Sequence, residues 1–171
     1  MDRATLERGC WDAMAGHDLI DVVDDVLRHL LAHEPRTTRS RLHLLAYYCQ
    51  AWYLVWEQVP LFASPIEAVE SGPVIPDIDL LLDSPTGLEE RASRLSDTQR
   101  LTIDTVIEAY AAFDDRELGE LARSERPWQL TRNQAPTEQS EARNTTIQLD
   151  VMREFYASVE EELEGPLLGE L

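Results

Sequence analysis

Apolar residues recur at helical spacing along most of the chain, and this pattern predicts a mainly α-helical fold. Residues 18–33 form one amphipathic segment, with Asp18 as a candidate N-cap and Pro35 beyond its end. In residues 39–57, apolar side chains cover nearly the whole circumference of the expected helix. A helix that is apolar all round is buried by its own domain or by a partner. We therefore expect a compact helical domain around this central buried helix.

Proline and glycine interrupt the helical pattern directly after the central helix. Residues 60–76 contain four prolines and one glycine, and no long helix survives that spacing. We expect a short extended insert at about residues 61–76. Its two predicted strands lie on either side of Ser71-Gly72 and cover Ile66–Val69 and Val74–Ile75.

Three residues of this insert have a predicted structural role: Gly72, Pro73 and Pro76. Gly72 is expected in a backbone conformation that residues with a Cβ rarely adopt, and Pro73 fixes the next φ angle. Proline at both ends of the second strand limits that strand to an edge. A short helix over residues 77–83 is expected to follow.

Capping residues divide the second half of the chain into further helices. Ser96 and Gln99 have the spacing of a capping box. The helix that follows presents five apolar side chains on one side, Ile103, Val106, Ile107, Tyr110 and Phe113. Asp114 or Asp115 is expected to cap a shorter helix, and residues 124–128, which include a proline, are expected to form a loop.

The C-terminal part is predicted to be a polar loop followed by one helix. Residues 133–144 read as the exposed loop, and the last helix is expected at about residues 146–163. Its apolar stripe consists of Ile147, Val151, Phe155, Val159 and Leu163. We expect one domain over residues 18–163, with an N-terminal arm or short helix at 1–17 and a tail at 164–171.

The chain is strongly acidic. Its 171 residues include 33 acidic side chains against 15 basic ones, which gives a net charge of −18. This charge disfavours non-specific binding to nucleic acid phosphates or to anionic lipid. A charged partner is therefore expected to be basic. The charged N-terminus and the lack of an apolar run of ~18 residues predict a cytoplasmic protein without a membrane span.

Few residues have the spacing of a catalytic or metal site. His29 and His33 are four residues apart and could share a metal ion, but this spacing is frequent by chance, and solvated histidines are the preferred interpretation. Cys49 lies on the apolar face of the central helix, which favours a buried, unreactive thiol. The chain contains no GxSxG motif, no phosphate-binding glycine loop and no paired CxxC. We expect neither an enzyme nor a bound cofactor or metal.

The N-terminal end of the central helix is the one locally basic part of the chain. Arg36, Arg39 and Arg41 lie there without an intervening acid, so this is where an anion would dock. A transcriptional regulator that binds DNA through these arginines is one alternative function. Three arginines in an acidic chain are too few to form the basic surface that binds nucleic acid phosphates, so direct nucleic acid binding is not expected.

Aromatic residues supply the material for a protein interface. Trp52 and Trp56 lie on the central helix and are interpreted as core residues. Trp128 lies in the predicted proline-marked loop, where a core role and a surface role are equally compatible with the sequence.

Five runs of residues carry specific motifs with aromatic, glycine or proline positions: Arg41–Trp52, Pro60–Phe62, Pro65–Ala68, Gly72–Pro76 and Glu117–Trp128. In this order and spacing they resemble the motifs of the Panacea domain of SocA-like antitoxins. The predicted last helix also resembles the closing helix of that family, so the likeness covers about residues 18–157. Arg41 and His43 stand where the family has lysine and glutamine.

The resemblance implies an antitoxin of a toxin-antitoxin system, which neutralises a toxin encoded beside it by direct protein contact. The toxin is expected to have a basic site. An alternative implied by the family is an adaptor that hands the toxin to a protease, which makes a protease or chaperone a further expected partner. The candidate toxin-binding residues are Tyr47, Tyr48, Trp52, Glu67, Ser124, Glu125 and Trp128, with the condition that among the first three only an exposed side chain qualifies.

Overall fold

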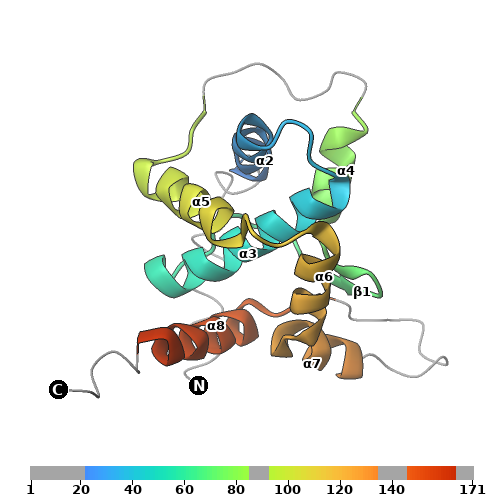
Figure 1. Ribbon diagram of the computed structural model, residues 1–171, viewed down its shortest axis with the longest axis vertical. Helices are drawn as coiled ribbons and strands as arrows, with labels where there is room; N and C mark the ends of the chain where they lie inside the picture. The colour runs from blue at the N-terminus through green and yellow to red at the C-terminus, as the bar shows by residue number, and fades with distance from the viewer. Residues whose placement is uncertain (1–21, 85–92, 135–145, 165–171) are drawn as a thin grey trace, which may run out of the picture.

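Seven helices and one antiparallel sheet make up the part of the chain that the computed structural model describes, residues 22–84, 93–134 and 146–164 (Figure 1). The elements in chain order are α2 (Val22–His33), α3 (Arg39–Glu57), β1 (Glu67–Val69), β2 (Gly72–Val74), α4 (Pro76–Leu82), α5 (Asp97–Tyr110), α6 (Asp115–Ser124), α7 (Arg126–Gln134) and α8 (Leu149–Glu164). The expected mainly helical fold is confirmed. The expected arm, the cap Asp18, and most of the predicted polar loop and tail lie outside the described residues.

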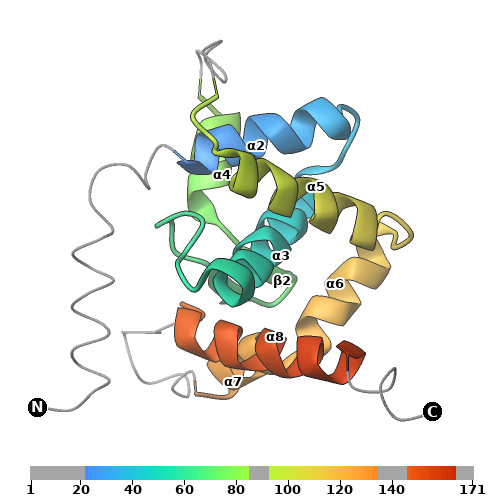
Figure 2. The same cartoon turned by 90° about the vertical axis from the view of Figure 1, so that its left-hand side faces the viewer.

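Helix α3 is the element against which the others pack. Fourteen of its 19 residues are buried, as expected for a helix that is apolar all round. The helix begins after Thr38, whose hydroxyl accepts a hydrogen bond from the backbone N–H of Arg41 at 3.1 Å. In Figure 2, α2 and α5 lie above α3 and α8 lies below it, while α6 and β2 cover a further side. None of the described helices combines the length and the apolarity that crossing a bilayer requires.

A buried glutamine holds the extended insert against α3. The side-chain oxygen of Gln50 accepts hydrogen bonds from the backbone N–H groups of Leu61, at 2.7 Å, and Phe62, at 3.2 Å. Its amide nitrogen donates to the carbonyl of Phe62 at 2.9 Å. The Gln50 amide therefore satisfies three backbone groups that a buried irregular segment would otherwise leave without partners.

The insert contains a small hairpin, as expected. Strands β1 and β2 pair antiparallel, with Ala68 opposite Pro73 in the middle of the register. The two strands form a sheet of their own, so a proline within β2 is compatible with its edge position. On the other side of β1, the N–H of Ile147 donates to the carbonyl of Ile66 at 2.8 Å, which joins the segment before α8 to the insert.

The predicted loop over residues 124–128 is wrong, because α7 begins at Arg126. Pro127 lies in the first helical turn, where its fixed φ and its missing N–H are both compatible with a helix. The carbonyl of Glu125 accepts a hydrogen bond from the N–H of Gln129 at 3.1 Å, as at a helix start. The proline therefore marks the beginning of a helix rather than a loop.

The apolar stripe predicted for the last helix is only partly buried. The residues of α8 that are buried are Met152 and Tyr156, which lie one position beyond the predicted stripe. Leu163, a member of that stripe, is 67% exposed. The buried face includes Tyr156 because its hydroxyl has hydrogen-bond partners inside the core, Tyr47 and Glu125. With these partners, the polar hydroxyl does not prevent burial of the ring.

Gly72 has a φ of +134°, which side chains with a Cβ rarely adopt. We expect Gly72→Ala to lower the free energy of unfolding by about 1–3 kcal/mol through backbone strain. Steric clash is not the cause, since the nearest atom to an added Cβ is a methyl carbon of Leu44 at 3.9 Å. Urea denaturation measures the change.

Gly119→Ala is the matched control. Gly119 lies within α6, where an added Cβ would lie 3.3 Å from the guanidinium tip of Arg123 and in ordinary contact with a methyl carbon of Leu44, at 3.9 Å. That tip can move, and alanine favours a helix over glycine, so the loss of stability should be smaller than at Gly72. Equal losses in the two variants would contradict the explanation by backbone strain.

Candidate functional site

Four aromatic side chains from α3, α5 and the α5–α6 connection touch one another in a row, and together form the aromatic ridge: Phe113, Tyr110, Trp52 and Trp56. The ring centroids of Tyr110 and Phe113 are 6.0 Å apart, and the indole N–H of Trp52 donates to the Tyr110 hydroxyl at 3.0 Å. The Trp52 and Trp56 rings stack with centroids 5.5 Å apart. The two ends of the ridge are open to solvent, since Trp56 is 40% exposed and Phe113 is 38% exposed.

Helix α8 adds acidic residues at the Trp56 end of the ridge. The indole N–H of Trp56 donates to the carboxylate of Glu160 at 2.8 Å. Glu161 and Glu162 follow and are exposed, and the last turn of α8 contains no basic residue. Figure 2 shows α5, the C-terminal end of α3 and α8 on the side that faces the viewer. Partly exposed aromatic rings beside acidic side chains have the composition of an interface for a basic protein partner.

Beneath the ridge, three tyrosines surround one buried carboxyl group. Tyr156 of α8 donates a hydrogen bond to Oε2 of Glu125 at 2.5 Å, and Tyr48 of α3 donates to the same oxygen at 3.2 Å. The hydroxyl oxygens of Tyr47 and Tyr156 are 3.1 Å apart. Because Tyr156 already uses its hydrogen for Glu125, Tyr47 is the donor in this pair. The Glu125 carboxyl thereby connects α3, α8 and the junction of α6 and α7.

Burial changes the acid-base properties of this cluster. It raises the pKa of Glu125 to about 7, and the hydrogen bonds from Tyr156 and Tyr48 oppose that shift only partly. Burial also raises the pKa of the Tyr48 and Tyr156 hydroxyls, which therefore stay protonated and remain donors.

The candidate toxin-binding residues do not lie on one surface. Tyr47 and Tyr48 are completely buried and Glu125 is nearly so, whereas Trp52 is partly exposed within the ridge. Among the three aromatic candidates of α3, the condition of exposure therefore selects Trp52. Ser124 is exposed at the end of α6.

Trp128 and Glu67 lie together at the hairpin. The indole N–H of Trp128 donates to the carbonyl of Val69 at 2.9 Å. The guanidinium carbon of Arg132 lies over the Trp128 ring, 5.8 Å from the ring centroid. Glu67 begins β1 and is half-buried. Trp128 thus links α7 to the hairpin, and its role in partner contact stays a prediction.

The expectation that Trp56 belongs to the core is wrong. Trp56 lies in the last turn of α3, where its ring stacks on Trp52 and the residue remains 40% exposed to solvent. The polar pair Glu57 and Gln58 directly after Trp56 was the available sequence signal that this turn reaches the surface.

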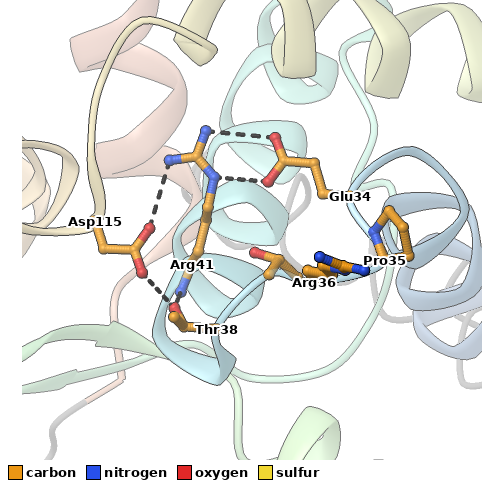
Figure 3. A pocket seen from close by; sticks show the side chains of 7 residues that line it. Glu34, Pro35, Arg36, Thr38, Arg41 and Asp115 are labelled. Atoms are coloured by element: carbon orange, nitrogen blue, oxygen red, sulfur yellow. Dashed lines mark hydrogen bonds and ion pairs between the residues drawn. The ribbon is translucent and has the colours of Figure 1, made fainter.

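The arginines at the start of α3 are engaged by acids from other segments. Arg41 is nearly buried, and its Nε donates to Glu34 at 2.7 Å (Figure 3). Its Nη1 donates to the carbonyl of Phe113 at 2.8 Å and lies 3.6 Å from a carboxylate oxygen of Asp115. In Figure 3, Arg36 points away from the Arg41 guanidinium. Arg41 therefore ties the α2–α3 connection to the α5–α6 connection.

Arg39 and His43 make equivalent connections to α4. Arg39 forms ion pairs with Asp79, at 3.0 Å, and Asp83, at 2.8 Å. The Nδ1 of His43 accepts a hydrogen bond from the N–H of Ile75 at 3.1 Å, so its Nε2 carries the hydrogen that faces Asp79 at 3.2 Å. Acids of the same chain thus balance the charges of Arg39 and Arg41, two of the three arginines that make this helix end locally basic.

Cys49 is completely buried in α3, and burial raises the pKa of its thiol. An unreactive thiol was expected from its place on the apolar face, and its burial agrees with that interpretation.

Ionisation of Glu125 should couple stability to pH. Because its pKa in the folded protein, about 7, exceeds the ordinary 4.5, the folded state holds more protons between these values, and stability falls as the pH rises through this window. Glu125→Gln stays neutral and removes this dependence. The free energy of unfolding of the variant minus that of the parent should rise by about 2–3 kcal/mol from about pH 5 to about pH 8, measured by urea denaturation.

Glu120→Gln is the control for this prediction, because Glu120 is an exposed residue of α6. Its stability should follow that of the parent across the pH range. If Glu125→Gln also follows the parent, the buried carboxyl does not titrate in this window.

A family model described as Antitoxin SocA-like, Panacea domain, matches residues 44–129, which is half of the chain. The matched region begins within α3, includes the hairpin and α4 to α6, and ends in α7. Comparison with curated proteins and with solved structures gave no match. The matched region contains the buried Gln50 and Glu125, whose contacts hold the fold together. The chain therefore belongs to the SocA-like antitoxin family, whose members carry the Panacea domain.

Proposed function

We propose that this protein is an antitoxin that neutralises a cognate protein toxin by direct binding, and that the aromatic ridge is part of the toxin-binding surface. The observation that carries the proposal is the ridge itself, four aromatic side chains in contact with two solvent-exposed ends, in a chain of an antitoxin family. Large aromatic residues contribute most of the binding energy in many protein interfaces.

The ridge is already ordered in the free protein. Trp52 is held by its hydrogen bond to Tyr110, and Trp56 by its hydrogen bond to Glu160 and by stacking on Trp52. Side chains that are fixed before binding lose less conformational entropy when a partner arrives. This arrangement favours a binding role for the ridge.

Charge supports a basic protein as the partner. The chain has a net charge of −18, and the acidic end of α8 lies next to Trp56. Opposite charges at the rim of an interface accelerate association. Since Arg39 and Arg41 are paired with acids of the same chain, the structure favours a protein partner over the phosphates of a nucleic acid.

The function is tested with the protein encoded beside this chain as the toxin candidate. Co-expression should relieve its toxicity, and the two proteins should elute together in size-exclusion chromatography. If the neighbouring protein is toxic but is neither bound nor neutralised, direct neutralisation of that protein is excluded.

Trp56→Ala should weaken toxin binding by about 2 kcal/mol or more, which is about thirtyfold in Kd. Leu80→Ala is the matched control, because Leu80 is 71% exposed on α4, next to Asp79, which pairs with the opposite end of α3. Isothermal titration measures both variants, and their melting temperatures are compared with that of the parent. A folded Trp56→Ala protein with parental affinity would remove Trp56 from the binding surface.

The association rate should fall as the ionic strength rises, while the dissociation rate changes little, because charges at an interface rim act mainly on encounter. Surface-immobilised kinetics over a salt series measures the two rates. Replacing Glu160, Glu161 and Glu162 with glutamine should reduce the salt dependence. An association rate that does not respond to salt would contradict electrostatic steering.

A further inference from the structure

We propose that His29, His33 and Asp104 form a binding site for a divalent transition metal ion of the Zn²⁺ type, which joins α2 to α5. The site is separate from the aromatic ridge and does not depend on the proposed antitoxin function.

The three side chains converge from two helices. His29 and His33 lie four residues apart on α2, which places them on the same face, and Asp104 comes from the middle of α5. One carboxylate oxygen of Asp104 is 2.7 Å from Nε2 of His29 and 3.4 Å from Nε2 of His33. One ligand atom from each residue lies within 4.8 Å of the other two.

The position of the hydrogen on the His33 ring decides which of its nitrogens can bind a metal ion. Its Nδ1 lies 3.0 Å from the backbone carbonyl oxygen of His29, and since a carbonyl only accepts, Nδ1 carries the hydrogen. In the neutral ring, Nε2 therefore bears a lone pair that points toward the Asp104 carboxylate. Two acceptors that face each other at this distance repel, and either a proton on Nε2 or a metal ion between them removes the repulsion.

A metal ion can bind both the His33 Nε2 and the Asp104 carboxylate oxygen. A histidine that binds a metal through Nε2 commonly donates its Nδ1 hydrogen to a backbone carbonyl, and the bond from His33 to the His29 carbonyl has this form. Zn²⁺ binds imidazole nitrogen and carboxylate oxygen at about 2.0–2.2 Å, so its tetrahedral ligands lie about 3.3–3.6 Å apart. The observed separations of 2.7 and 3.4 Å reach that geometry with small side-chain movements.

The donor set selects the class of metal. Two imidazoles and one carboxylate suit Zn²⁺, and Cu²⁺ and Ni²⁺ by the general order of affinities, whereas Mg²⁺ and Ca²⁺ prefer oxygen ligands alone. Three protein ligands leave a coordination position for water. His33 and Asp104 are exposed and His29 is partly exposed, so an ion can reach the site from solvent.

Binding would fasten two of the helices that cover α3. Helices α2 and α5 both pack against α3 and touch each other, and His29 and Asp104 are 75 residues apart in the chain. A metal bridge across such a separation should stabilise the folded protein, because a site assembled from distant segments does not exist in the unfolded chain.

The test uses the full chain, freed of metal, with ZnCl₂ as the probe. Isothermal titration should show one Zn²⁺ bound per chain, and Zn²⁺ should raise the melting temperature while Mg²⁺ does not. His33→Ala and Asp104→Asn should each weaken Zn²⁺ binding by at least about tenfold. Glu108→Gln, an exposed acid one turn further along α5, is the matched control and should bind as the parent does.

Proton NMR of the unaltered chain provides a measurement that does not depend on the folding of variants. The imidazole signals of His29 and His33 should shift on addition of Zn²⁺, whereas that of the buried His43 should not. The proposal is overturned if Zn²⁺ leaves the His29 and His33 signals unchanged, or if folded His33→Ala and Asp104→Asn proteins bind Zn²⁺ as tightly as the parent.

Discussion

Burial of the greater part of α3 is the constraint on which the rest of the structure depends. A helix that is apolar around its whole circumference needs cover on every side, and burying one large apolar side chain contributes about 1.5–3 kcal/mol. The helices α2, α5, α6 and α8 and the hairpin provide that cover, and each of them contacts α3.

Polar groups inside this core decide where each covering segment lies. Apolar contact alone tolerates sliding, but a buried polar group without a partner costs about 1–3 kcal/mol, so each such group specifies a position for its partner. Gln50 fixes the insert, Glu125 fixes the α6–α7 junction against α8, and Arg41 fixes the connections at the start of α3. Arg41 and His43 therefore serve the fold of this chain.

The aromatic ridge and the acidic residues of α8 lie at the C-terminal end of α3, where that helix is no longer fully buried. The last turn of α3 emerges between α5 and α8, and there the aromatic ridge meets solvent and the acids of α8. The rigid cluster around Glu125 supports the ridge from below through contact of Tyr156 with Trp52 and of Tyr48 with Tyr110. For the proposed toxin binding, such a base holds the exposed aromatic edge in place before a partner arrives.

Local signals in the sequence were sufficient for the elements of the fold. The apolar run over residues 39–57 predicted α3 with its observed bounds, and the capping box at Ser96 predicted the start of α5, because both signals act within a few residues. The sequence did not reveal that Trp56 is exposed, that Glu125 is buried among tyrosines, or that Asp104 meets His29. Each of these facts is a relation between segments far apart in the chain, and only the packing of α5, α6 and α8 around α3 brings those segments together.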